Sequence, residues 1–580
     1  MAYPDTSIIP RLWKTETVTD YADIDALVAD FQRRGGQPGV AYGIVRDGEL
    51  VHTAGFGERD LGGPPPDADT VFRIASMTKS FTATAVLLLR DEGRLALDDP
   101  AERYVPELRG WATPERTPIT IRHLLTMTAG FPTDDPWGDR QQGLPLDEFA
   151  KLLADGVSFN WVPGTRFEYS NLGYAILGLI ITAVTGTPYK DFVRGRLMTP
   201  LGMTRSGYEP ASENLARGYR RAPDGWVLVP LDPYGAFAPM GGVFTCVRDL
   251  AHWVAGFAAA FAATTTSAGA TADSHPLAAA SRREMQLPQL PTGWDRPAAF
   301  PADGTVTAYG FGLAMADEPG LGRVAGHGGG YPGFGSYMRW HLASGTGVIA
   351  LGNSTYARMG PLSARILHAV LNGETSAQAP DPWPQTLAAR DAVTALLTFW
   401  DDAVADRLFT PNVALDAPYP ERRDAIALIK DRIGEFRASD RKAQHDTPAH
   451  CRWWLTGERG TVQVQIQLNP ERPPRIQSLN LAIPPGPGSP LSSALDAVLA
   501  WLNGTGPAPE AGNEVVDAAL LERRLRSAAA WAGRCALTAY TAGNGTSTVT
   551  AELTGEHAAL ALSVTIDPAS GQLVTAAITS

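Results

Sequence analysis

The stretch IASMTKSFTATAVLLLRDEG, residues 74–93, decides the fold, because it predicts a helix that begins beside two side chains suited to catalysis. From residue 80 onward the apolar positions follow helical spacing, and the run stops at a glycine, which is typical of a helix end. Ser76 therefore lies at or near the N-terminus of the predicted helix. Lys79 follows Ser76 by three residues, so a helical backbone brings both side chains to one face, within ~6 Å of each other.

The pair of Ser76 and Lys79 suits nucleophilic catalysis. A neutral lysine can accept the serine proton, and apolar surroundings favour the neutral form because they lower the lysine pKa. The pair alone is a weak signal, since a chance Ser-x-x-Lys is expected in roughly a quarter of chains with so few lysines. Its interpretation depends on the other motifs.

A second motif lies in RFEYSNLGYAILG, residues 166–178, which contains the only Tyr-x-Asn of the chain. Tyr169, if placed beside Ser76 and Lys79, could relay a proton to a leaving group, and the amide of Asn171 could hold a substrate carbonyl. A tyrosine just before an apolar helix is more often a packing residue. This motif is therefore also ambiguous by itself.

A third motif lies in VAGHGGGYPGFGSY, residues 324–337, where His327 precedes three glycines. The absence of side chains at Gly329 and Gly330 lets a substrate approach the backbone closely. The amide of Gly330 could pair with the amide of Ser76 as an oxyanion hole. Taken alone, the glycine run is equally typical of a tight turn.

Outward from these motifs, the first 370 residues predict an α+β domain. A helix is expected over residues 23–33. It is followed over residues 39–57 by an antiparallel hairpin about Asp47-Gly48, a favoured two-residue turn. Strand-like runs return over residues 322–353, and a mostly helical region lies between. The sheet is thus expected to combine both ends of this domain around a helical insertion.

The rest of the chain predicts two small tandem α+β domains. A linker rich in proline and alanine spans residues 374–384, and LTGE at residues 455–458 recurs at residues 553–556. Asn469-Pro470 is echoed by Asp567-Pro568 at the same offset. The predicted domains are a catalytic domain over residues 1–374, a first repeat over residues 385–484 and a second repeat over residues 490–580, the two repeats joined by PPGPGSP.

The order Ser-x-x-Lys, Tyr-x-Asn and basic residue-x-Gly resembles the motifs of the serine β-lactamase and penicillin-binding-protein family, which includes class C β-lactamases, D,D-carboxypeptidases, esterases and D-aminopeptidases. The resemblance covers residues 22–372 and extends to LDDPAERYVPEL, ITIRHLLTMTAGFP and YGFGLA. It implies an antiparallel sheet flanked by helices, with the site between the sheet and a helical subdomain. It also implies that Ser76 is acylated, that Lys79 and Tyr169 transfer protons, and that Asn171 binds substrate.

His327 departs from the lysine found there in β-lactamases. A histidine with a pKa near ~6.5 is mostly neutral at pH 7 and lacks the fixed charge that suits a substrate carboxylate. We therefore expect a hydrolase that cleaves an ester or amide bond in a small molecule or short peptide. One form of this expectation is an amide bond at a D-configured residue. Two alternatives stay open: an acyltransferase or peptide cyclase of natural-product biosynthesis that uses the same acyl-enzyme, and a sensor that stays acylated.

Bulk properties exclude several other functions. The net charge is -12 and no run of Lys or Arg could neutralise a phosphate backbone, so nucleic acid is not an expected partner. The purest apolar run, residues 175–184, is half the ~20 residues of a membrane-spanning helix. Without a recognisable secretory signal at the N-terminus, the expected location is the cytoplasm. No metal or cofactor site is predicted, the cysteines are expected to be mostly buried, and the C-terminal domains are candidates for oligomerisation.

Overall fold

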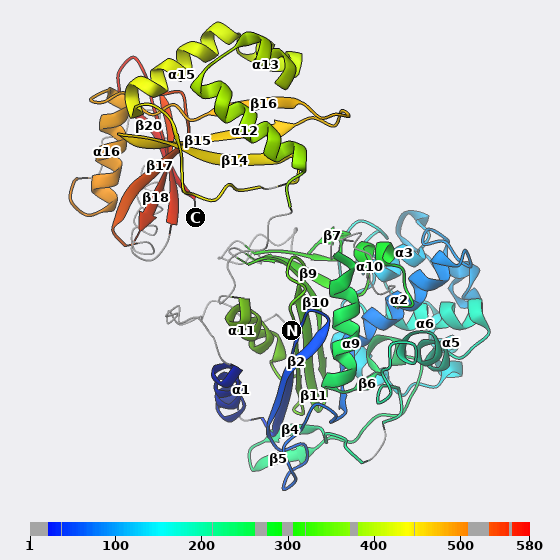
Figure 1. Cartoon of the computed structure of the whole chain (residues 1–580). Coiled ribbons are helices and arrows are strands. Elements are labelled where there is room, and N and C mark those ends of the chain that lie inside the picture. Colours follow the sequence, from blue (N-terminus) through cyan, green and yellow to red (C-terminus); the bar gives the residue numbers. More distant parts are fainter. Residues whose placement is uncertain are drawn as a thin grey trace. The chain divides into compact units, whose positions relative to one another are not determined.

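The computed structural model describes residues 21–35, 37–210, 213–261, 275–292, 305–318, 321–371, 381–445, 447–507, 533–555 and 559–579. They belong to two compact units, Met1–Ala377 and Gln378–Ser580 (Figure 1). The division falls inside the expected linker, of which residues 374–380 lie outside the described part of the chain. Each unit is therefore considered by itself.

The first unit is built on an antiparallel sheet whose eight described strands run in the order β2-β1-β12-β11-β10-β9-β8-β7. The opening hairpin is confirmed: Asp47 and Gly48 have φ angles of 52° and 81°, as a tight two-residue turn requires. Because β12 pairs with β1, the sheet joins both ends of the unit, as expected. The strands are β1 (Gly39–Arg46), β2 (Glu49–Gly57), β7 (Leu290–Pro291), β8 (Val306–Tyr309), β9 (Ala314–Glu318), β10 (Gly322–Tyr331), β11 (Phe334–His341) and β12 (Gly347–Gly352).

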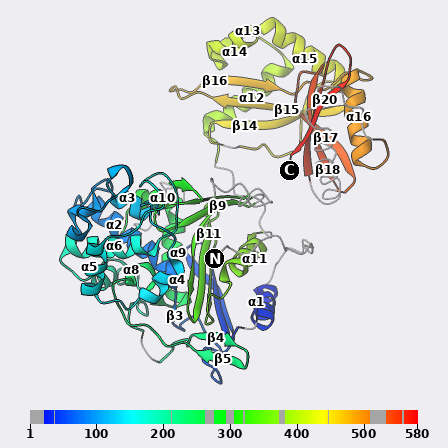
Figure 2. The same cartoon turned by 180° about the vertical axis from the view of Figure 1, so that it is seen from behind.

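Helices cover both faces of this sheet (Figures 1 and 2). The predicted N-terminal helix is α1 (Tyr21–Gly35), which packs with α11 (Met359–Leu371) on one face. On the other face α9 (Val247–Ala258) contacts β1, β2, β11 and β12. The helical insertion adds the larger hydrophobic core of the unit, in which α2 (Thr78–Asp91) and α6 (Asn171–Thr185) pack together.

Short elements complete the first unit. A two-residue pair, β3 (Phe72–Arg73) with β6 (Phe244–Thr245), brackets the insertion. The others are η1 (Ala75–Met77), η2 (Ala101–Arg103), η3 (Pro106–Leu108), η4 (Pro114–Arg116), α3 (Ile121–Leu125), α4 (Asp135–Gly138), η5 (Asp139–Gln141), α5 (Leu146–Asp155), α7 (Tyr189–Val193), η6 (Arg194–Met198), the hairpin of β4 (Tyr219–Ala222) and β5 (Gly225–Leu228), α8 (Ala238–Gly241), η7 (Ala259–Phe261) and α10 (Ala279–Met285).

The second unit contains helices and one continuous sheet. Its described strands run in the order β13-β14-β15-β17-β18-β19-β20, with β16 also paired to β15. The elements are α12 (Pro384–Thr398), α13 (Asp402–Leu408), α14 (Pro411–Asp416), α15 (Tyr419–Ile433), β13 (Arg437–Ala438), β14 (His450–Gly457), β15 (Gly460–Leu468), β16 (Ile476–Leu481), α16 (Pro490–Leu502), β17 (Cys535–Gly543), β18 (Thr548–Gly555), β19 (Ala559–Ile566) and β20 (Leu573–Thr579).

Both copies of the sequence repeat begin near the end of a strand that pairs antiparallel with the next strand. The first LTGE lies at the turn between β14 and β15, and the second begins at the end of β18, before β19. Each half has its own hydrophobic cluster, and Tyr540 packs against both. Two parallel contacts in the described chain, Val462 to Tyr540 and Ile483 to Asn544, join the two halves. The expected boundary between two separate domains at residues 484–490 stays a prediction.

Two further features concern buried and apolar segments. Cys246, Cys451 and Cys535 are buried, as expected. Within the described residues, no single helix is both long and apolar enough to cross a bilayer. Together, α6 and Tyr189–Met198 meet those two criteria, and they are bent by 79°.

Candidate active site

Ser76 lies in η1, the tight turn that leads directly into α2, which confirms its predicted place at a helix start. The preceding residue, Ala75, has a φ angle of 47°, a conformation that L-residues adopt at a cost of ~1–3 kcal/mol. Hydrogen bonds hold the turn in this shape: the Ile74 amide donates to the Val243 carbonyl over 3.0 Å, and the Ser336 hydroxyl donates to the Ile74 carbonyl over 2.8 Å. The side chain of Ser76 is thus presented by a fixed backbone.

Lys79 is fully buried, and its amine contacts three acceptors. Lys79 Nζ lies 3.0 Å from Ser76 Oγ, 2.7 Å from Asn171 Oδ1 and 3.0 Å from the Met240 carbonyl oxygen. The two carbonyl-type oxygens can only accept hydrogen bonds. When Lys79 is neutral, both of its N–H groups are therefore directed to Asn171 and Met240, and the nitrogen lone pair is directed at Ser76. This is the geometry of a general base for the serine.

The environment of Lys79 also lowers its pKa. Burial is the main cause and brings the pKa from 10.5 to about 8, while Asp135, Asp134 and Asp139 oppose the change. At pH 7 roughly a tenth of the molecules carry the neutral amine, compared with less than a thousandth for an ordinary lysine. The sequence predicted that apolar surroundings would lower the pKa of Lys79. It did not predict the three carboxylates that act in the opposite direction.

Tyr169 lies close to both Lys79 and His327. Lys79 Nζ is 4.9 Å from the centre of the Tyr169 ring, and the rings of Tyr169 and His327 are 6.5 Å apart. The structure therefore brings together the three motifs that lie far apart in the sequence. Tyr169 comes from the segment just before α6, and Asn171 is the first residue of that helix.

His327 is buried on β10 with 5% of its surface exposed, and both ring nitrogens have partners. Nδ1 lies 2.6 Å from the Gly328 carbonyl oxygen, which can only accept, so Nδ1 carries the proton. Nε2 then accepts from the Tyr309 hydroxyl at 3.0 Å. Burial, with Lys79 nearby, lowers the pKa of His327 from 6.5 to about 3, so this side chain is neutral across the physiological range.

Packing explains the glycines that follow His327. A Cβ atom at Gly329 would lie 2.1 Å from the Ile74 carbonyl oxygen, and one at Gly330 would lie 2.8 Å from the Tyr356 ring. The backbone of β10 thus runs directly against the turn that carries Ser76. Among the described strands, β9 pairs with β10 only at residues 322–326, so residues 327–331 form an edge on that side. An edge of this kind can hydrogen-bond an extended substrate.

The sequence interpretation missed three carboxylates near Lys79. Asp134 and Asp135 follow the segment ITIRHLLTMTAGFP, and Asp139 begins η5. Burial raises the pKa of Asp139 to about 6 and also raises that of Asp134. Two adjacent aspartates in a loop are most often solvent-exposed turn residues, so the sequence alone provided no reason to place Asp134 and Asp135 near Lys79. Tyr309, the partner of His327, lies in the quoted YGFGLA but received no role.

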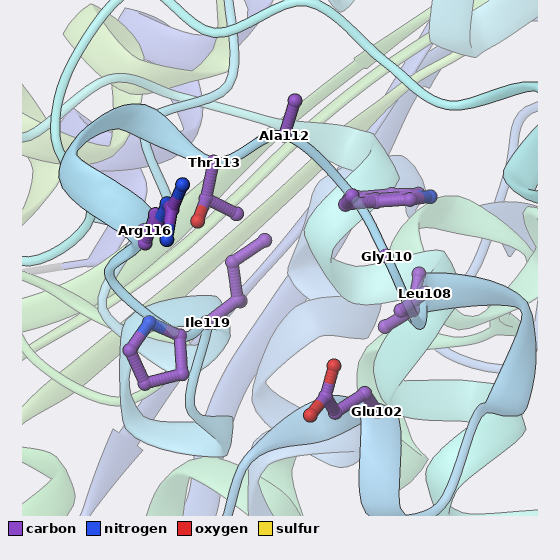
Figure 3. A pocket seen from close by; sticks show the side chains of 9 residues that line it. Glu102, Leu108, Gly110, Ala112, Thr113, Arg116 and Ile119 are labelled. Atoms are coloured by element: carbon purple, nitrogen blue, oxygen red, sulfur yellow. The ribbon is translucent and has the colours of Figure 1, made fainter.

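Other parts of the described chain offer less chemistry. No group of three His, Cys, Asp or Glu side chains is arranged there to hold a metal ion. A cavity of about 430 Å³ is lined by residues from one segment of the chain, residues 102–119, among them Glu102, Trp111, Arg116 and Ile119 (Figure 3). It contains none of the residues of the three motifs.

Comparisons with known proteins show which family and fold this chain resembles. A family model described as Beta-lactamase matches residues 24–371. Protein flp of Staphylococcus aureus strain COL is 31% identical over 237 residues, 40% of this chain and 47% of the relative. Beta-lactamase-like protein 2 of Dictyostelium discoideum is 28% identical over 251 residues, 40% of this chain and 45% of the relative. The matched stretch thus spans about half the length of these curated relatives.

A solved structure has a similar fold over nearly the whole chain. It is the octameric penicillin-binding protein homologue from Pyrococcus abyssi, with a TM-score of 0.52 and 20% sequence identity. The match covers 95% of this chain and 97% of that one. At this identity the likeness concerns the fold alone.

Proposed function

This chain belongs to the β-lactamase family and is therefore of the serine hydrolase type, and on that premise we propose that it cleaves an ester or amide through an acyl-enzyme on Ser76. The observation that carries the proposal is the aim of Lys79: its amine is held by two fixed acceptors, 3.0 Å from the serine oxygen. A nucleophile and a base within hydrogen-bond reach, the base itself oriented by further groups, are the requirements for this chemistry.

In the proposed reaction Lys79 takes the proton of Ser76 as the serine oxygen attacks the substrate carbonyl. The amides of Ser76 and Gly330 stabilise the oxyanion, because both belong to elements that contact each other, η1 and the edge strand segment of β10. Tyr169 passes the proton to the leaving group as the carbonyl–leaving group bond breaks. Water then attacks the acyl-enzyme carbonyl and gives a proton to the same pair. That proton passes to Ser76 Oγ as the bond between the acyl group and the serine oxygen breaks, which releases the acid and restores the free enzyme.

The neutral state of His327 supports substrates without a carboxylate at this position. Burial lowers the pKa of His327 to about 3, so the side chain carries no positive charge that could pair with a substrate carboxylate. An ester, or an amide at a D-configured residue, of a small molecule or short peptide is the substrate class that we propose. A p-nitrophenyl ester series, D- and L-aminoacyl amides and nitrocefin should rank in that order of preference by kcat/KM, with nitrocefin last.

Replacing His327 by lysine should shift the preference toward substrates that carry a carboxylate, since a lysine is mostly protonated at pH 7 whereas the buried histidine ring is neutral. The measurement is the ratio of kcat/KM for paired acid and methyl-ester substrates. His252→Lys, an exposed position on α9, is the matched control and should leave the ratio unchanged. An equal ratio in wild type and His327→Lys would show that this position does not face the ligand.

The products formed from the acyl-enzyme distinguish hydrolysis from the two alternatives, acyl transfer and a stable acylated state. We favour hydrolysis, because water needs no binding subsite and the edge of β10 near Ser76 is not covered by another described strand. A bound acceptor can outcompete water, since orientation in a subsite is worth ~10⁵ M or more. The acyl-enzyme is therefore formed from an activated ester in millimolar amines, alcohols or a peptide amine. Free acid as the main product supports a hydrolase, transfer product supports an acyltransferase or cyclase, and release of no more than one equivalent supports an acylated sensor.

We also propose that residues Gln378–Ser580 mediate assembly with further copies of this chain. Two large apolar side chains on this unit, Phe399 and Leu415, are 84% and 81% exposed. Large apolar and aromatic side chains are enriched at the centres of protein interfaces. The similarly folded homologue from Pyrococcus abyssi is described as octameric.

The assembly proposal predicts that the full chain is larger than a monomer by light scattering after size-exclusion chromatography. The double variant Phe399→Ser with Leu415→Ser should lower the mass, because it removes the apolar side chains and leaves the fold of the buried clusters intact. Val227→Ser, an exposed apolar position in the first unit, is the control. A monomeric wild-type chain would contradict the proposal.

A further inference from the structure

Two consecutive aspartates hold Asn171 in two different ways. The Asp134 carboxylate accepts hydrogen bonds from the backbone amides of Asn171 at 2.7 Å and Leu172 at 2.8 Å, at the N-terminus of α6. The Asp135 carboxylate accepts from the side-chain amide, with Asn171 Nδ2 at 2.9 Å from Asp135 Oδ1. Asp134 thus fixes the backbone of Asn171, and Asp135 fixes the orientation of its amide group.

The contact with Asp135 determines which end of the Asn171 amide faces Lys79. A carboxylate can only accept hydrogen bonds, so the NH₂ group must point to Asp135 and the oxygen must point away from it. That oxygen lies 2.7 Å from Lys79 Nζ. If the amide turned over, an NH₂ group would face the N–H groups of Lys79, and the amine would lose one of the two acceptors that direct its lone pair at Ser76.

We infer that Asp135 is a positioning residue for the proposed reaction, acting through Asn171 to aim Lys79 at Ser76. The inference rests on the proposed function, because it assumes that Lys79 is the base. Among the described residues, Asp135 is hydrogen-bonded to Asn171 and has no hydrogen bond to Ser76. Its effect on the reaction comes from one hydrogen bond and from its negative charge.

Because Asp135 is negatively charged, its replacement should change the pH dependence of the reaction as well as its rate. The titratable groups that surround Lys79 are Asp134, Asp135 and Asp139 from the loop and short helices before α5, Tyr169 and Tyr174 from α6 and the segment before it, and His327 from β10. Among the charged groups, Asp135 has the largest opposing effect on the lowered pKa of Lys79. Because Asp135 stabilises the ammonium form, its neutralisation should lower the pKa of Lys79 further.

The test compares Asp135→Asn with the wild-type enzyme for acylation of Ser76 by a p-nitrophenyl ester, measured as the pre-steady-state rate across pH 5 to 10. Asparagine can present either an oxygen or an NH₂ group to Asn171, so the amide orientation is no longer imposed. We expect acylation to slow by about 10- to 100-fold, the scale of small misplacements in an active site. We also expect the acid limb of the pH profile to move to lower pH.

Two further variants separate positioning from general damage. Asp135→Glu keeps the charge and the acceptor on a longer side chain, and should return the acid limb to its wild-type position with partial recovery of the rate. Asp147→Asn, an exposed carboxylate on α5 that pairs with Lys151, is the control and should match wild type. Thermal unfolding of every variant is measured in parallel to show that each one is folded.

The outcomes distinguish this inference from the proposed function. Wild-type enzyme is first labelled with a fluorophosphonate, and failure to label Ser76 would overturn the proposed function together with this inference. If wild type is labelled but Asp135→Asn acylates at the wild-type rate, only the role of Asp135 is overturned. A slower Asp135→Asn variant whose acid limb stays in place would also overturn it, since the loss would then be unrelated to the charge beside Lys79.

Discussion

Replacement of Ser76 by alanine is expected to lower kcat/KM for the best ester substrate by about 10⁴-fold or more, the loss seen when a nucleophile is removed from a serine hydrolase. The reason is structural as well as chemical. The strained turn at Ala75 places the Ser76 hydroxyl oxygen 3.0 Å from Lys79 Nζ. Of the three oxygens around this amine, it is the one that carries a proton for Lys79 to accept. An alanine there leaves the amine without a proton to accept.

The readout for Ser76 is covalent labelling as well as turnover. A fluorophosphonate should add its mass to the peptide that contains Ser76, and Ser76→Ala should abolish that addition. Ser80→Ala is the matched control, because Ser80 is a buried serine on the same helix whose hydroxyl donates to the Met77 carbonyl. It should be labelled like wild type. Unchanged labelling of Ser76→Ala would place the nucleophile elsewhere.

The second large effect is expected at Lys79. Lys79→Ala should reduce kcat by about 10²- to 10⁴-fold, the usual scale for loss of a general base. Lys79→Arg is the more informative change, since it keeps a positive charge but cannot be deprotonated in this pH range. It should be as slow as alanine. Lys151→Ala, an exposed lysine on α5, serves as the control.

The sign of the pH dependence follows from the lowered pKa of Lys79. The reaction needs the neutral amine, so wild-type kcat/KM should rise with pH and level off above about 8. The histidine does not contribute a limb near neutrality, because its pKa is lowered to about 3. A profile that is flat from pH 6 to 9, or a Lys79→Arg variant with near-normal turnover, would show that another group acts as the base.

The sequence predicted the features that depend on local spacing. A spacing of three residues from Ser76 to Lys79 on a helix places both side chains on one face whatever surrounds them. The Asp47-Gly48 turn similarly imposes an antiparallel hairpin, because its two residues adopt positive φ angles that match the twist of the strands. The order of the three motifs along the chain, together with the flanking segments LDDPAERYVPEL, ITIRHLLTMTAGFP and YGFGLA, then indicates the family.

Tertiary structure decided how the pair becomes reactive. The two acceptors that orient the Lys79 amine, Asn171 Oδ1 and the Met240 carbonyl oxygen, are 92 and 161 residues away in the chain. No sequence pattern indicates that either of them contacts Lys79. The same holds for Asp135, which reaches Asn171 across 36 residues. The pKa values of Lys79 and His327 depend on burial, which is a property of the packed core and not of a motif. Sequence spacing thus determined which side chains can react, whereas long-range packing determined their orientation and charge.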